Sequence, residues 1–82
     1  MAIYKKIHIY VEAVFFNGYN VHQVTEFSKG ELKVRLSFDG DLVLVDSNGN
    51  RVGKQGEYII REGYKHYYSL SEDEFHAIYE RA

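Results

Sequence analysis

Residues 31–52 contain an alternating strand, a tight-turn signal, an apolar strand and a second tight-turn signal, and this order limits the fold more than any other feature of the chain. The apolar side chains of its first strand fall on even positions, at Leu32, Val34, Leu36 and Phe38. The dipeptides at 39–40 and 48–49 are Asp-Gly and Asn-Gly, and Asn-Gly favours a type I′ hairpin turn. The segment therefore predicts antiparallel hairpins with one dry face and one wet face.

The flanking segments predict further strands and two short helices. Residues 7–16 alternate as a strand, and residues 57–61 and 64–70 supply the last two strands. Asn20 with Gln23, and Ser71 with Glu74, have the spacing of capping boxes at the start of helices. We expect an α+β fold, a small twisted antiparallel sheet of about five or six strands with two short helices packed on one face. No linker or repeat divides the chain, so residues 1–82 form one predicted domain.

Composition narrows the class of protein. The chain has 82 residues, no cysteine and a formal net charge of −2. It contains no apolar run of the roughly 20 residues that cross a membrane, and its first residues lack the pattern of a secretory signal. We therefore expect a cytoplasmic protein that does not contact the membrane.

The chemically reactive residue types do not form a recognisable catalytic pattern. The four histidines lack the i, i+3 or i, i+4 spacing of zinc ligands, although His66, His8 and Glu12 could meet in space. No serine lies in a G-x-S-x-G segment, and the glycines at 49–56 lack the G-K-[ST] step of a phosphate loop. We expect a protein that is not an enzyme and that has no catalytic residue, metal site or cofactor.

Aromatic residues concentrate in one part of the chain, since five of the eight tyrosines lie in residues 56–80. Most of these rings are expected to form the core and its rim, because the last helix must bury its apolar stripe against the sheet. The alternative is an exposed aromatic recognition surface, for which Tyr10 and Tyr67 are the candidates.

Basic residues on the wet face of the hairpins raise the question of nucleic acid. Lys33, Arg35, Arg51 and Lys54 could form a basic stripe there, with Tyr10 or Tyr67 available for stacking. The acidic net charge and the absence of a known nucleic-acid-binding motif count against nucleic acid as a partner.

Four stretches of the chain form a distinctive combination: "YKK" at 4–6, "VEAVFFNGYNVHQVTEF" at 11–27, "GEYIIR" at 56–61 and "YYSLSEDEFHAIYE" at 67–80. Together they resemble a family of small phage and prophage proteins of unassigned function, the PGDYG-like proteins. The matching positions are Tyr4, Lys5, Glu12, Ala13, Gly18, Phe27, Gly56, Tyr58, Arg61, Tyr68, Phe75, Ala77, Tyr79 and Glu80.

The chain departs from that family at two places. Gln55 and Glu57 replace a proline and an aspartate, and "SLSE" replaces a Pro-Cys-x-Pro segment, so Ser71 must start the last helix. The resemblance implies a phage or prophage accessory protein, in the cytoplasm of a bacterial host cell. Among the matched charges, Glu12 and Arg61 lie on or beside strands, where they form either a cross-strand ion pair or part of a site.

Two functional hypotheses follow. In the first, the chain is a non-catalytic protein that binds a host or phage protein, as an inhibitor or anti-defence factor. In the second, it binds a small ligand or nucleotide-like anion in a pocket between sheet and helix, surrounded by His66, Tyr68, Arg61 and Glu12. A homodimer paired through an edge strand such as "KHYYSL" is compatible with both. The candidate binding residues are Tyr10, Glu12, Arg61, His66, Tyr67 and Tyr68.

Overall fold

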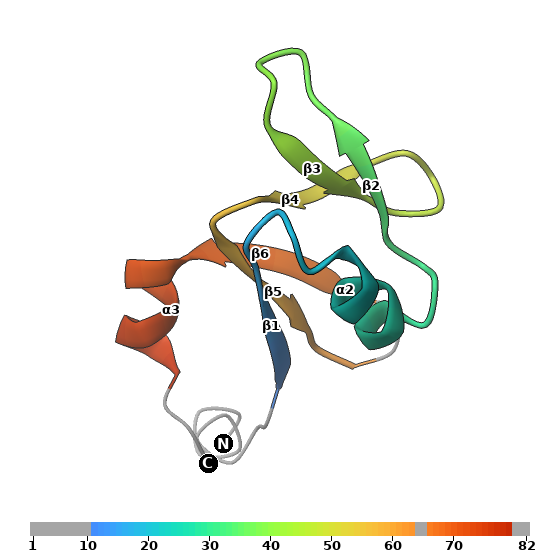
Figure 1. The fold of residues 1–82 in the computed structure, drawn as a ribbon. Helices are drawn as coiled ribbons and strands as arrows, with labels where there is room; N and C mark the ends of the chain where they lie inside the picture. Colours follow the sequence, from blue (N-terminus) through green and yellow to red (C-terminus); the bar gives the residue numbers. More distant parts are fainter. Residues whose placement is uncertain (1–10, 64–65, 80–82) are drawn as a thin grey trace.

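The computed structural model describes residues 11–63 and 66–79, and these form six strands and two helices (Figure 1). In chain order the elements are β1 (Glu12–Phe16), α2 (Val21–Ser28), β2 (Lys33–Leu36), β3 (Leu42–Val45), β4 (Arg51–Lys54), β5 (Glu57–Arg61), β6 (Tyr67–Ser71) and α3 (Glu72–Ile78). The predicted α+β class is confirmed. In the described part of the chain, no helix is long and apolar enough to cross a membrane.

The strands divide between two antiparallel sheets, with the orders β1-β5-β6 and β2-β3-β4. The division falls between Gln55 and Gly56. The Gln55 N–H donates to the Leu42 carbonyl, which extends the pairing of β3 with β4 (2.9 Å). The Gly56 N–H donates instead to the Phe16 carbonyl (2.7 Å), so the following strand pairs with β1. The expected single sheet of five or six strands is therefore not confirmed.

The two helices contact different strands. α2 packs against β1, whereas α3 packs against β5 and β6. The expectation that both helices cover one face of a single sheet is not confirmed either. α3 begins with the predicted capping box, in which Ser71 and Glu74 each bond the other's backbone N–H. α2 has Asn20 at its N-cap without the predicted capping box, because the Asn20 Oδ1 atom accepts from the Asn17 N–H (3.0 Å) outside the helix. The amide nitrogen of Asn20 donates to the Phe15 carbonyl and to Gln23.

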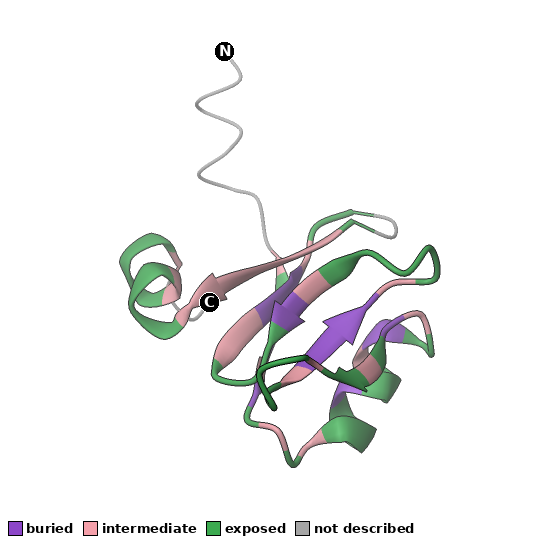
Figure 2. Cartoon of the chain, turned by 90° about the horizontal axis from the view of Figure 1, so that it is seen from above, coloured by how far each residue is buried: buried purple, intermediate pink, exposed green. Residues whose placement is uncertain are grey.

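The core lies where the two sheets and α2 meet. Figure 2 shows the buried segments on the central strands, and the exposed segments on the hairpins and helix surfaces. The buried core cluster consists of Val14, Phe16, Val24, Leu32, Leu44 and Ile59. Each large apolar side chain buried there contributes roughly 1.5–3 kcal/mol to folding.

The β2–β3 hairpin extends away from this core (Figure 1). Its predicted dry face is dry only at its base: Leu32 is buried, whereas Leu36 and Phe38 are 70% and 106% exposed. The turn of the other hairpin, between β3 and β4, is not the predicted type I′ turn. Among the described residues other than glycine only Lys29 has a positive φ, so Asn48 does not adopt the conformation of a type I′ turn. Gly49 has the positive φ (84°), and its N–H donates to the Asp46 carbonyl.

Candidate functional site

The outer face of the sheet β2-β3-β4 brings four basic residues together. In the register of the sheet, Lys33 lies opposite Val45, and Val45 lies opposite Arg51. Two residues further along β2, Arg35 lies opposite Val43, and Val43 lies opposite Lys54. Residues directly opposite one another in a sheet share a face. The cations of β2 and β4 therefore flank two valines of the central strand.

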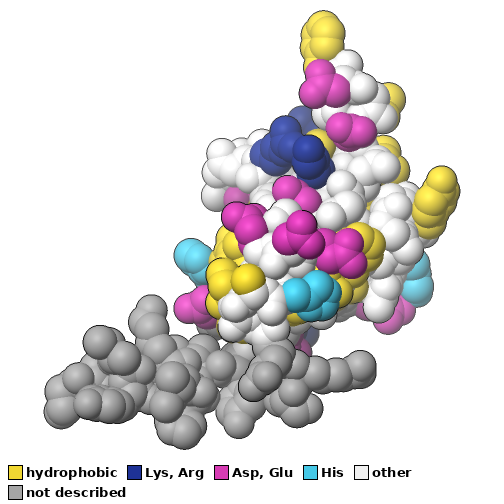
Figure 3. Space-filling model, turned by 90° about the vertical axis from the view of Figure 1, so that its left-hand side faces the viewer, with side chains coloured by type: hydrophobic (Ala, Val, Ile, Leu, Met, Phe, Trp, Pro, Cys, Tyr) yellow, Lys and Arg dark blue, Asp and Glu magenta, His cyan; other side chains and the backbone are white. Residues whose placement is uncertain are grey.

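These cations are exposed, whereas the two valines between them are 6% and 8% exposed. Long basic side chains cover apolar neighbours with their aliphatic stems and keep their charges in water. In the described part of the chain, the ion pairs are His22 with Glu26 and Arg61 with Glu12, and neither involves the sheet face. Figure 3 shows Lys and Arg side chains gathered in one patch beneath the end of the hairpin. We call Lys33, Arg35, Arg51 and Lys54 the basic face.

The end of the β2–β3 hairpin carries exposed apolar side chains, and Leu36 lies on the face of β2 opposite to Lys33 and Arg35. Leu36 and Phe38 are exposed there, beside the exposed carboxylates of Asp39 and Asp41. Figure 3 shows hydrophobic and acidic side chains together at this end of the molecule. The alternation of residues 32–38 predicts a dry face that includes Leu36 and Phe38. Alternation alone could not show that the core ends before the hairpin does.

Glu12 and Arg61 form the cross-strand pair that was one of the two predicted alternatives. They are register partners on β1 and β5, and Arg61 donates through Nε (3.1 Å) and Nη2 to the Glu12 carboxylate. The hydrogen bond to this carboxylate raises the pKa of Arg61. Arg61 also donates to the Phe27 carbonyl (2.6 Å), and its guanidinium lies 4.9 Å from the centre of the Phe27 ring. Through these contacts Arg61 holds the C-terminal end of α2 against the sheet.

Tyr67 joins the same group of contacts. Its hydroxyl donates to the Ser28 carbonyl (3.3 Å), and its ring meets the Phe27 ring edge-on at 6.3 Å. Tyr67 is half-buried, which agrees with the prediction that most tyrosines form core and rim. The structure therefore brings Glu12, Arg61 and Tyr67 together at the C-terminal end of α2.

Tyr68 points to the opposite face of β6, since neighbouring residues of a strand alternate. Its hydroxyl lies 2.8 Å from the Tyr79 hydroxyl and donates to Glu62 (3.1 Å). Burial raises the pKa of Tyr68, and the hydrogen bonds to Tyr79 and Glu62 raise it further. The His66 ring is 5.8 Å from the Tyr68 ring. Tyr10, the remaining candidate, lies outside the described residues.

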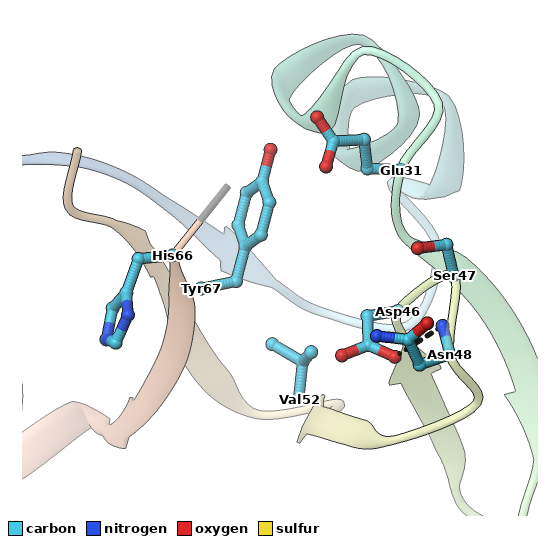
Figure 4. Close-up of a pocket in the computed structure, with 7 residues that line it drawn as sticks. All are labelled: Glu31, Asp46, Ser47, Asn48, Val52, His66 and Tyr67. Atoms are coloured by element: carbon cyan, nitrogen blue, oxygen red, sulfur yellow. Dashed lines mark hydrogen bonds between the residues drawn. The ribbon is translucent and has the colours of Figure 1, made fainter. Parts of the chain in front are cut away.

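A shallow depression of about 320 Å³ lies between β6 and the loops that precede β2 and β4. Its lining residues are Glu31, Asp46, Ser47, Asn48, Val52, His66 and Tyr67 (Figure 4). Of the four residues predicted to surround a ligand pocket, only His66 is among them, because Arg61, Glu12 and Tyr68 are engaged elsewhere. Within residues 11–63 and 66–79, no group of three or more His, Asp and Glu side chains is placed to hold a metal ion.

Comparison with known proteins adds no relative, since no family model, curated protein or solved structure matches the chain.

Proposed function

We propose that this chain is a small non-catalytic accessory protein, of the phage or prophage type that its sequence resembles, and that it binds another protein inside a bacterial host cell. The observation that carries the proposal is the apolar end of the β2–β3 hairpin, where Leu36 and Phe38 are 70% and 106% exposed. Their burial against a partner would gain roughly 25 cal/mol for each Å² removed from water. An aromatic anchor beside charged side chains is typical of a protein contact surface.

The second hypothesis, a binder of small anions, has weaker support. The depression near Tyr67 carries the carboxylates of Glu31 and Asp46, and these repel an anionic ligand. Arg61, the cation predicted to line the pocket, already donates to Glu12 and to the Phe27 carbonyl. A host or phage protein remains the proposed partner.

Affinity capture tests the proposal. The tagged protein is incubated with lysates of infected and uninfected bacteria, and retained proteins are identified by mass spectrometry. The double variant Leu36→Ser/Phe38→Ser should lose the retained partner. Tyr19→Ser is the matched control, because Tyr19 is also exposed (94%) but lies on the loop between β1 and α2. A partner that the double variant retains as well as the unchanged protein would contradict the role of the hairpin.

A further inference from the structure

β2 has an open edge. It is the outer strand of its sheet, and β3 is the described element against which it packs extensively. Leu42, opposite Leu36 in the register, directs its backbone groups toward β4: its carbonyl accepts from the Gln55 N–H, and its own N–H donates to the Gln55 side chain. In an antiparallel ladder, Leu36 must then direct its N–H and C=O away from β3, and so must Val34 two residues earlier. The edge offers two donors and two acceptors to an added strand.

The charges along this edge have the spacing of a strand. Lys33 and Arg35 are two residues apart on one face, which is about 6.6–6.8 Å. An extended peptide with acidic residues at every second position repeats its carboxylates at the same interval. Arg51 and Lys54 lie two strands away, about 10 Å, which is close to the screening length at physiological salt. All four cations therefore add to the positive potential at the edge.

We propose that the partner contributes an extended acidic segment, which adds as a fourth strand to the edge of β2 and pairs its carboxylates with the basic face. This inference rests on the proposed function and names the chemistry of the partner. The added strand would present its carboxylates to Lys33 and Arg35 on one face of the sheet and its alternate side chains to Leu36 on the other face, so backbone, charged and apolar contacts would all be made along one edge.

Two other occupants fit this edge less well. A second copy of the chain would bring the Lys33 and Arg35 of both copies together, and like charges on paired strands are destabilising. A nucleic acid would leave the outward N–H and C=O groups unpaired, and its phosphates would meet Asp39 and Asp41 at the hairpin end.

The test uses a synthetic ten-residue peptide of alternating Glu and Thr, labelled with a fluorophore and followed by anisotropy at low and physiological salt. A peptide of the same composition, N-methylated at alternate residues, keeps the charges but cannot pair as a strand. We expect the unmodified peptide to bind and to protect the amides of Val34 and Leu36 from hydrogen exchange. Arg35→Gln should weaken binding roughly two- to fivefold, because one exposed ion pair is lost. Lys29→Gln, which removes an exposed cation outside the basic face, should leave binding unchanged.

Equal binding of the N-methylated peptide would overturn the inference, because charge alone would then explain the contact. Tighter binding of a twelve-residue oligothymidylate than of the peptide would overturn it in favour of nucleic acid. If the peptide fails to bind while lysate capture still depends on Leu36 and Phe38, the strand addition is wrong and the proposed function stands. If capture also ignores these two residues, the proposed function fails as well.

Discussion

Gly53 on β4 lies so close to Ile59 on β5 that a β-carbon at Gly53 would stand 2.7 Å from the Ile59 Cδ1 atom. The same β-carbon would be 2.8 Å from the β-carbon of Ser69 on β6. Gly53 is buried, and its φ is not in the left-handed region. The glycine is therefore required by the close approach of the two sheets, and not by its backbone conformation.

Gly53→Ala should destabilise the protein by about 1–3 kcal/mol, because the extra methyl group overpacks the contact between the sheets. Urea denaturation followed by circular dichroism measures this change. Ile59→Val removes the Cδ1 atom and should alone cost about 0.5–1.5 kcal/mol. In the G53A background we expect Ile59→Val to cost less, since it relieves the clash. Simple additivity of the two changes would contradict the proposed steric cause.

The close approach at Gly53 joins segments that are distant in the sequence, and a contact of this kind is not predicted by local sequence patterns. Alternation and turn residues predicted β5 and the hairpin strands, because each depends on neighbours in the chain. The division into two sheets depends on whether the Gly56 N–H bonds to β1 or to β3, which is a contact between distant segments. For the same reason, the four basic residues were recognisable as a stripe, whereas the exposure of Phe38 was not.

Arg61 should matter more for stability than its partner Glu12. The Arg61 side chain is 18% exposed and also satisfies the Phe27 carbonyl, whereas the Glu12 side chain is 69% exposed. Glu12→Gln should therefore cost below about 1 kcal/mol. Arg61→Ala should cost about 1.5–3 kcal/mol, because it removes charged hydrogen bonds and the contact with the Phe27 ring. Equal losses of unfolding free energy in urea would show that the ion pair alone carries the effect.

Tyr68 should make the protein less stable at alkaline pH. Burial and the contacts with Tyr79 and Glu62 raise its pKa in the folded state above the ordinary value of 10.0. Above about pH 10 the unfolded chain loses the phenolic proton while the folded protein keeps it, so the free energy of unfolding falls as pH rises. Tyr68→Phe removes this dependence. The stability difference between the two proteins should be constant from pH 7 to 9 and shrink above pH 10, and a constant difference at higher pH would refute the assignment.

The capping box of α3 should determine the stability of that helix. Ser71→Ala leaves the Glu74 N–H without its side-chain acceptor and should cost about 0.5–2 kcal/mol. Glu74→Gln is the matched control, because glutamine can still accept from the Ser71 N–H and complete the box. Hydrogen exchange in residues 72–78 should therefore accelerate in the first variant and change little in the second. The opposite order would indicate that the charge of Glu74, and not the cap, stabilises the helix.

Phe38 should contribute little to folding. Its ring is 106% exposed, so Phe38→Ser removes no buried apolar surface and should change the free energy of unfolding within about 0.5 kcal/mol. Phe16→Ala is the contrasting variant, because Phe16 is 0% exposed and its truncation should cost about 3–5 kcal/mol. Urea denaturation of both variants separates the two roles. A loss of stability in Phe38→Ser comparable to that of Phe16→Ala would mean that the ring is buried in solution, and the hairpin end could not then be the open contact surface that the proposed function requires.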